Sequence, residues 1–563
     1  MLFTWTGNPW VDTGIAVIVA KSGKERIEDL TDSDFDTVVS DGLWLAIANR
    51  QLNAFTMVVG INSPLTNTSL NPSMKKENRG KLNHMEDPGL KQYCNLIKEL
   101  KESVLENSCG TFTCESCGER AATDVLKKYK KEIGRDWFPL AGSIGSDAQM
   151  LPAASRTARI CSLCLLSIQF LPLGAIIVGG KIACFQSTHM ELTQMFVGEI
   201  FNETVNRLQL LKIGEKLSAV GQGKGTKESL IMLIKIMGEL QQNKRMLELP
   251  HHASLNIWLF SNSGQEPDCD VVEIPNEALV FLWDVTRSYR QEIEATLRNE
   301  PKRIDFQLLE CIKRKSDYYG FYPYRGVKPA SKGLFELYHA KILENSAHSL
   351  KLAEWLAYQV TSRLAEGDKN DKKFLSQLLK ENAYGNKDKT VLGRLKGLIA
   401  QIAEDGLFTL DDYTVIFPKE EKVYPLSVRK DAFKWIWFYI NHKDINNIKT
   451  EGGDTLFTHP LIRSFARDTF NYYQRERGIK YIKRNILDAF KKGEIATSDL
   501  QRWFINLSET KDDYTNEAWD DLCRDANGNN ITTEVRFQFR LEMANLYRLA
   551  MTENKTTEGG VIK

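Results

Sequence analysis

Hydrophobic residues recur every three or four positions through much of the chain, a period that predicts amphipathic helices. Residues 255–260 instead alternate and include aromatic and β-branched side chains, which predicts a strand that leads into the polar loop 261–265. From about residue 335 onward the pattern is almost wholly helical, with a break at the Pro-flanked segment 417–425. The helices expected before that point are 88–108, 121–134, 188–220 and 227–246.

The segment from Ile160 to Gly180 contains 21 residues without a charge, about the length of a membrane span. It also contains Pro172 and a Gly179-Gly180 pair placed like a hairpin turn, so we expect a buried hairpin. The N-terminus has neither the basic segment nor the cleavage site of a secretory leader. We therefore expect a soluble, cytoplasmic protein.

Two stretches are expected to be loops. Residues 8–14 predict a loop that leads into an apolar element, with Asp12 or Thr13 as the residue that caps a short helix. Residues 62–90 are rich in Asn, Ser, Lys and Gly, which predicts a long mobile loop.

The elements predict an α+β multidomain protein: a mixed N-terminal domain with an inserted zinc ribbon-like module of four cysteines, followed by a C-terminal all-α helical bundle. The length of 563 residues agrees, because a single core stops growing at about 250–300 residues. We expect residues 1–110 and 188–416 to form the two parts of the α+β domain. Residues 111–187 would be the zinc-binding insertion with its hairpin, and residues 428–552 the bundle.

The overall charge is balanced, with 74 Lys and Arg residues against 73 Asp and Glu residues. No global field attracts nucleic acid, so any such surface requires local clustering of basic residues.

Four of the ten cysteines form two pairs of equal spacing, Cys114-Glu-Ser-Cys117 and Cys161-Ser-Leu-Cys164. A two-residue gap lets both thiolates of a turn bind one ion, and two such turns complete a tetrahedral four-sulfur shell. We therefore expect a structural zinc ion. Because four thiolates leave no open coordination position on the ion, we expect it to take no part in catalysis. The alternatives are four unrelated buried cysteines or a redox pair.

Two basic clusters are candidates for contacts with a nucleic-acid backbone. The first is interleaved with tyrosines, a composition that suits phosphates and stacked bases; its members are Lys313, Arg314, Lys315, Arg325, Lys328 and Lys332. The second lies in the predicted bundle, where the spacings allow its members to share helix faces; they are Arg463, Arg467, Arg477, Lys480 and Arg484. Lys127 and Lys128 form a weaker cluster. For the first cluster the alternative is a loop whose tyrosines pack on the core while its lysines are solvated; for the second it is a solvated surface.

No motif of an active site is present. The segment Gly221-Gln-Gly-Lys-Gly225 lacks the spacing and the Ser or Thr of a phosphate-binding loop, and there is neither a nucleophile elbow nor HExxH. We expect a protein that is not an enzyme.

Three features together resemble the CXXC–CXXC family, the large subunit of type I-B CRISPR surveillance complexes (Cascade). They are the segment from Thr6 to Gly14, the two cysteine pairs, and the Phe-Ser-Asn-Ser-Gly-Gln loop from Phe260 to Gln265. The resemblance implies a subunit that contacts the 5′ end of the guide RNA and tests double-stranded DNA for a motif beside the target. It also implies that the subunit helps to open and hold the DNA strands.

The resemblance further implies a set of partners. They are the guide RNA, target DNA and its displaced strand, the backbone, 5′-handle-binding and small subunits, and a helicase-nuclease or, in transposon-borne relatives, transposition proteins. The predicted bundle resembles the small subunit. Since no Met lies between Met246 and Met543, separate synthesis of the bundle would need a different start codon.

Short polar side chains on the loop after the predicted strand could reach base edges. We therefore expect Asn262, Ser263 and Gln265, with Asn8 as a weaker candidate, to read the DNA motif; an ordinary turn is the alternative. Two other functions remain open: a stand-alone zinc-containing DNA-binding enzyme (a nuclease or transposase component), and a scaffold that contacts only proteins.

Overall fold

The chain forms two compact units, residues 1–300 and 301–563. The computed structural model describes residues 3–59, 63–78, 81–106, 111–129, 133, 134, 136–140, 158–211, 215–217, 225–243, 248–262, 268–300, 304, 307–322, 329–379, 388–409, 412, 435–442, 460–492, 494–507, 514–524 and 532–558. The division at 300/301 falls inside the range 188–416 that was expected to be part of one domain, and the predicted domain ranges stay a prediction.

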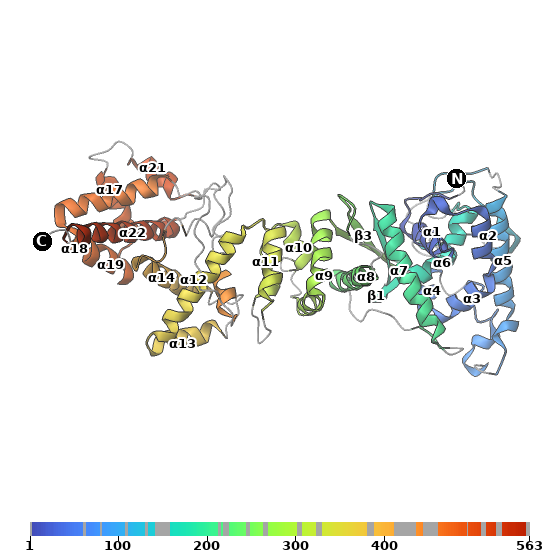
Figure 1. Cartoon of the computed structure of the whole chain (residues 1–563). Coiled ribbons are helices and arrows are strands. Elements are labelled where there is room, and N and C mark those ends of the chain that lie inside the picture. Colours follow the sequence, from blue (N-terminus) through green and yellow to red (C-terminus); the bar gives the residue numbers. More distant parts are fainter. Residues whose placement is uncertain are drawn as a thin grey trace. The chain divides into compact units, whose positions relative to one another are not determined.

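The first unit is built around two helices that are buried on all sides. These are α1 (Pro9–Lys21) and α6 (Ser162–Gly174), whose uniformly apolar faces are typical of central helices. Gly14 permits their close approach, because a Cβ there would lie 1.9 Å from the Ser167 carbonyl oxygen. Around this pair lie α2 (Asp32–Ser40), α3 (Gly42–Gln51), α4 (Asn53–Val58) and α5 (Pro88–Leu105) (Figure 1).

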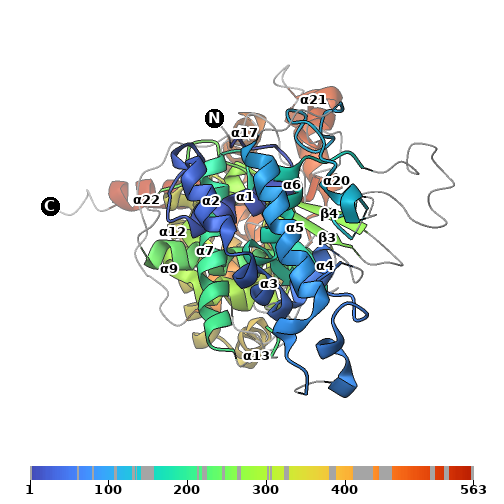
Figure 2. The ribbon, with the colours of Figure 1, turned by 90° about the vertical axis from the view of Figure 1, so that its right-hand side faces the viewer.

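A four-stranded antiparallel sheet completes this unit, in the order β1-β2-β3-β4. Its strands are β1 (Ile176–Val178), β2 (Lys181–Ser187), β3 (Leu255–Ser261) and β4 (Asp268–Ile274), and β4 forms one edge beside β3 (Figure 2). The register pairs Phe185 with Ile257 and Trp258 with Val271. The long helices α7 (Met190–Gln209), α8 (Gly225–Gln242) and α9 (Asn276–Arg298) belong to the same unit.

The mixed fold class is confirmed, but several predicted elements differ. The uncharged segment 160–180 is mostly the helix α6, and only its end forms the predicted hairpin, with Gly179 and Gly180 between β1 and β2. The periodicity could not decide this, because a buried helix and a buried strand are both apolar on every side. The helix expected over 121–134 contains, among its described residues, only the 3₁₀ turn Val125–Tyr129.

The two predicted loops are also more ordered than expected. Helix α1 begins at Pro9 and is capped by Asn8, so Asp12 and Thr13 are not its caps. Asp12 instead accepts hydrogen bonds from the backbone N–H groups of Thr6 and Gly7, at 2.7 and 3.0 Å. In the segment predicted to be mobile, the structure describes the 3₁₀ turns Pro72–Met74, Lys76–Asn78 and His84–Glu86.

The second unit is wholly helical among the residues described. It begins with α10 (Leu308–Lys313), α11 (Lys332–Lys341), α12 (Ala347–Glu366), α13 (Lys369–Leu378) and α14 (Asp388–Glu404). The helical residues 435–440 pack here, since Phe438 stacks on Phe335 and the Trp437 indole N–H donates to the Leu378 carbonyl.

The end of the chain forms a helical bundle with its own core of buried residues. Its elements are α17 (Pro460–Arg477), α18 (Ile479–Tyr481), the π-helix Ile482–Leu487, α19 (Asp488–Lys492), α20 (Thr497–Leu507), α21 (Asn516–Leu522) and α22 (Thr532–Glu558). Helix α14 packs on α22, where Arg540 and Glu404 form an ion pair at 2.7 Å. Among the described residues, no helix has the length and apolar character needed to cross a membrane.

Candidate metal centre and basic surfaces

The first cysteine pair lies in a tight turn closed by a β-bridge between Thr113 and Ala121. The Gly118 N–H donates to the Cys114 carbonyl at 3.0 Å, and Gly118 has a φ of +69°, a left-handed conformation that favours glycine. The second pair lies at the start of α6, where Cys161 is the N-cap residue and Cys164 is in the first turn. A turn and a helix end therefore supply two thiols each.

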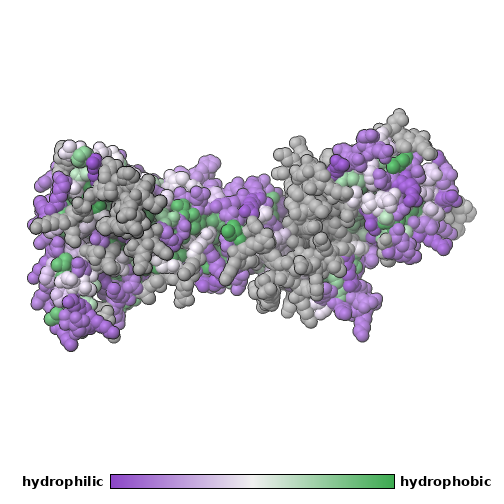
Figure 3. All heavy atoms as spheres, turned by 180° about the vertical axis from the view of Figure 1, so that it is seen from behind, coloured by the Kyte–Doolittle hydropathy of each residue, from purple (hydrophilic) through white to green (hydrophobic). Residues whose placement is uncertain are grey.

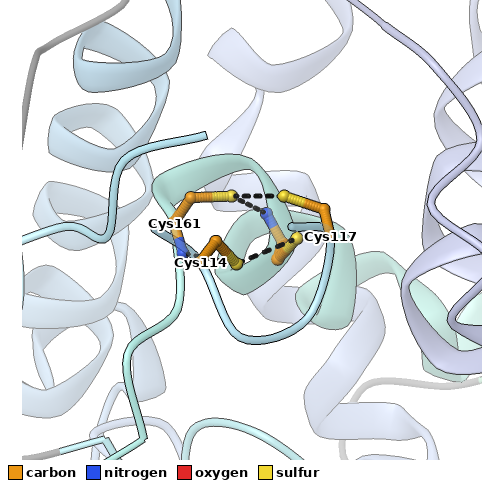
Figure 4. Close-up of side chains that lie close together, drawn as sticks. Cys114, Cys117 and Cys161 are labelled. Atoms are coloured by element: carbon orange, nitrogen blue, oxygen red, sulfur yellow. Dashed lines mark hydrogen bonds between the residues drawn. The ribbon is translucent and has the colours of Figure 1, made fainter. Parts of the chain in front are cut away.

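The four thiols converge on one point. Their sulfur atoms all lie within 4.8 Å of one another, and Cys114, Cys117 and Cys161 point toward one another in Figure 4. The Cys114–Cys164 and Cys117–Cys161 sulfur atoms are 3.9 Å apart, too far for a disulfide of about 2.05 Å. A tetrahedron with metal–sulfur bonds of about 2.3 Å has edges of about 3.8 Å, so these two distances are close to those of a four-cysteine metal site.

Backbone groups support the sulfur atoms in the way expected of thiolate ligands. The Cys161 N–H donates to the Cys114 sulfur at 3.2 Å, and the Cys164 N–H donates to the Cys161 sulfur at 3.4 Å. The Glu115 N–H donates to the Arg159 carbonyl at 2.7 Å, which joins the two cysteine segments across 44 positions of sequence. Such outer contacts fix the ligands before a metal binds.

Because the thiols lie close together, their pKa values shift in opposite directions. Hydrogen bonding with Cys114 holds the pKa of the Cys117 thiol well below its ordinary value, and Cys161 and Cys164 add to this effect. Hydrogen bonding with Cys114 also raises the pKa of the Cys164 thiol. Ionisation is thus favoured at Cys117 and opposed at Cys164. A divalent cation bound here would favour the ionised form of all four thiols, because coordination deprotonates a thiol.

Three of the four cysteines are shielded from solvent, and Cys117 is half-buried. Cys114, Cys161 and Cys164 are at most 2 % exposed, and all four positions of a tetrahedral shell are taken by protein sulfur. A metal held here would have no open coordination position, which is typical of structural rather than catalytic sites.

The residues predicted to read DNA have structural partners where they are described. Asn262 is 6 % exposed, and its side chain joins the Val58 carbonyl (2.9 Å) to the Leu140 N–H (3.2 Å). Asn8 caps α1 by accepting from the N–H groups of Trp10 and Val11. Ser263 and Gln265 lie outside the described residues. Base reading by this group stays a prediction.

The described basic residues of the first cluster lie beside carboxylates. The ion pairs are Lys313–Glu310 (3.5 Å), Arg314–Glu310 (3.9 Å), Lys315–Glu344 (2.8 Å) and Lys332–Glu354 (2.8 Å). Arg325 and Lys328 lie outside the described residues.

Three of the aromatic residues between these cations are buried and cannot stack on bases; Tyr319 is half-buried, and Tyr324 lies outside the described residues. Tyr318, Phe321 and Tyr322 are at most 1 % exposed, and they pack against Phe335 and Tyr338 in the core of the second unit. For these three residues the alternative of tyrosines packed on the core holds, because alternation of tyrosine with lysine does not distinguish a core-facing segment from a groove.

The second basic cluster is more accessible. Arg467, Arg477, Lys480 and Arg484 are exposed and form no ion pair among the described residues, while Arg463 is half-buried. The described surface of the bundle is mostly hydrophilic, as the right-hand end of Figure 3 shows.

Gly478, with a φ of +79°, separates α17, which carries Arg477, from α18, which carries Lys480; Arg484 lies on the π-helix that follows. The prediction that these three share one continuous helix face is therefore wrong. They flank a helix junction that continues into a π-helix, a local geometry frequent at functional sites.

Lys127 and Lys128 lie on the 3₁₀ turn beside the cysteine cluster. Lys127 lies 2.8 Å from Asp124, and Lys128 lies 3.5 Å from Glu99. Both side chains are exposed, and contact of this cluster with nucleic acid stays a prediction.

Sequence reasoning missed a cavity between α7 and α8 in the first unit. Glu199, Glu203 and Arg207 recur at four-residue spacing on α7, and Lys235, Glu239 and Asn243 do so on and after α8; all six line this cavity. Matching polar stripes on two helices were the available signal, but nothing in the sequence alone indicates that the stripes face each other.

A four-cysteine cluster at a turn and a helix N-terminus forms a module that could hold a metal ion. Residues 108–176, the region that contains all four cysteines, match the model of the CRISPR-associated protein family Cas_CXXC_CXXC. This match agrees with the resemblance to the CXXC–CXXC family that the motifs predicted. No curated protein and no solved structure matches the chain.

Proposed function

We propose that this chain is the large, non-catalytic subunit of a type I-B RNA-guided DNA surveillance complex. The observation that carries the proposal is the coincidence of the family match with the four-thiol cluster, since residues 108–176 contain all four cysteines. Membership of a CRISPR-associated family implies work alongside other components of that system and nucleic acid.

The proposed metal is zinc, held by Cys114, Cys117, Cys161 and Cys164. Four thiolates in a tetrahedral arrangement favour zinc among the common divalent cations, and the sulfur–sulfur distances of 3.9 Å fit its bond lengths. Zinc there would hold the turn of residues 113–121 against α6, and so against the centre of the first unit.

Recognition of a DNA motif and contact with the guide RNA are part of the proposal. In such complexes base pairing with the guide reads the sequence, while protein groups read a short adjacent motif. The exposed cations around Gly478 support a role for the bundle in holding a nucleic-acid strand, because surface cations bind phosphates by releasing counterions. Exposed Tyr472 adds an aromatic face on the same helix as Arg467 and Arg477.

The proposal is tested by purifying the tagged chain from its own cells, measuring zinc and sequencing the nucleic acid that accompanies it. We expect about one zinc ion per chain, as for one four-cysteine shell, together with short repeat-derived RNA and several other subunits. Zinc without RNA or partner proteins would contradict the proposal.

The same preparation separates this proposal from its two competitors. A stand-alone nuclease would cleave DNA when Mg²⁺ or Mn²⁺ is added to the isolated chain. A scaffold that contacts only proteins would show no salt-dependent binding of nucleic acid.

A further inference from the structure

The first unit contains a cavity of about 560 Å³, within the usual size range of small-molecule sites. The facing sides of α7 and α8 form its walls, and the start of α4, the end of α6 and β1 form its floor. Leu217 also lines it, where its N–H donates to the Gln51 carbonyl at 2.8 Å. The cavity is separate from the four-cysteine cluster, since none of its lining residues belongs to that cluster.

The lining divides into an apolar floor and a polar rim. Ile176, Ile177 and Ile236 present aliphatic surface suited to a flat ring. The rim carries the amides of Asn53, Asn202 and Asn243, each of which can both donate and accept hydrogen bonds. A ligand that complements both parts has an apolar body with donors and acceptors along its edge.

The charges of the rim narrow the class of ligand. Three carboxylates (Glu199, Glu203 and Glu239) and three cations (Arg207, Lys235 and Arg290) line the cavity. This balance does not suit a run of several phosphates, which the carboxylates would repel. It does suit one anionic group beside hydroxyl groups, because a carboxylate is the usual partner of a ribose hydroxyl.

Two of the cations are already engaged. Arg290 follows the kink in α9 at Tyr289 (φ −135°, ψ 25°), and its guanidinium donates to Glu239 at 3.2 Å. It also lies over Gly238, where an added Cβ would come within 2.3 Å of it. Arg207 lies 3.9 Å from Glu203. Arg290 is thus a fixed part of the wall.

Lys235 is the remaining cation. It is half-buried and forms no ion pair in the part of the chain that the structure describes. A partly desolvated ammonium at a cavity wall attracts an anionic oxygen more strongly than one in open solvent.

We propose that this cavity binds one unpaired ribonucleotide. The base lies on the isoleucine floor within reach of the rim amides, and the phosphate faces Lys235. A ribose hydroxyl faces Glu199, whose carboxylate accepts a long hydrogen bond of 3.4 Å from the Asn243 amide. The site is distinct from any motif-reading loop, and the inference holds whether or not the chain is a surveillance subunit. The nucleotide is either free in solution or part of an RNA strand.

The test is calorimetric titration of the purified full-length chain with the four ribonucleoside 5′-monophosphates, their 2′-deoxy counterparts and a short single-stranded RNA. We expect saturable binding of at least one ribonucleotide, and weaker binding of its deoxy form. Lys235→Gln should weaken binding about tenfold, the loss expected for one charge-assisted hydrogen bond. Thr204→Trp should abolish it by filling the cavity that Thr204 lines.

Lys98→Gln is the matched control, because Lys98 is 71 % exposed on α5 and does not line the cavity. Circular dichroism melts of the three variants check that they fold. Binding of mononucleotides identifies a free nucleotide. Binding of RNA alone, lost in both cavity variants, identifies a nucleotide of a strand. No binding of any probe, equal binding of deoxy forms, or full binding by both cavity variants would overturn the proposal.

Discussion

Asn262 illustrates how one side chain can have a structural and a functional interpretation. Its amide joins the end of β3 to the Val58 carbonyl and the Leu140 N–H, and it is buried. We expect Asn262→Ala to lower the free energy of unfolding by about 1–3 kcal/mol, the cost of leaving buried backbone groups without a partner. Denaturant unfolding measures this cost. Asn299→Ala is the control, because Asn299 is exposed and its side chain donates within its own helix region.

The same variant also separates the two interpretations. If Asn262 only supports the loop, Asn262→Ala should weaken binding to all DNA motifs alike. Loss of discrimination between motifs, with affinity for the weakest site unchanged, would instead assign base reading to this side chain.

Arg50 and Asp87 form the most buried ion pair of the first unit among the described residues. Their closest N–O distance is 3.2 Å, and the side chains are 9 % and 4 % exposed. Asp87 also accepts from the Ser73 N–H, which attaches the 3₁₀ turns to α3. Asp87→Ala should cost about 3–5 kcal/mol, since it leaves a buried guanidinium unpaired.

Amide hydrogen exchange followed by mass spectrometry locates this effect. We expect faster exchange in residues 63–78 and in α3, because the variant releases both. Glu102→Ala removes the partner of Lys98 in an exposed pair and should change stability by no more than about 1 kcal/mol. Equal exchange in the two variants would show that the buried pair does not hold this segment.

At the scale of elements, the four-cysteine cluster fixes where α6 begins. Removal of the proposed zinc with a chelator should destabilise the first unit by about 3 kcal/mol, the linkage expected when the free metal concentration exceeds the dissociation constant a hundredfold. Thermal unfolding with and without chelator measures the shift. Cys117→Ser should mimic it, while Cys269→Ser, an exposed cysteine outside the cluster, should retain both metal and stability.

The contrast between predicted and observed elements has a physical cause. The cysteine pairs could be predicted because each ligand pair is local in sequence, at positions 114 and 117 and at 161 and 164. The role of Asn262 could not, because its partners lie 122 and 204 positions away. Helix α6 was mistaken for a hairpin strand because it is buried on every side, which removes the periodicity that distinguishes the two.

At the scale of the whole molecule, charge decides how nucleic acid can bind. The formal net charge is only +1, so long-range attraction is weak and the proposed binding would depend on the exposed cations of the bundle. Replacement of Arg477, Lys480 and Arg484 by Glu should weaken binding of single-stranded nucleic acid. It should also reduce the slope of log K against log salt by about 2, at roughly 0.7 for each phosphate that the protein no longer neutralises.

The control must change the net charge equally, because a shift of six charges alone alters association. Lys369, Lys372 and Lys373 of α13 are exposed and form no ion pair among the described residues, so their replacement by Glu is a matched change in the same unit. Affinities measured between about 50 and 200 mM salt give both slopes. A reduced slope in the first variant alone assigns phosphate contacts to the junction around Gly478. Equal slopes in both variants would attribute the effect to overall charge and would leave these residues as solvated surface.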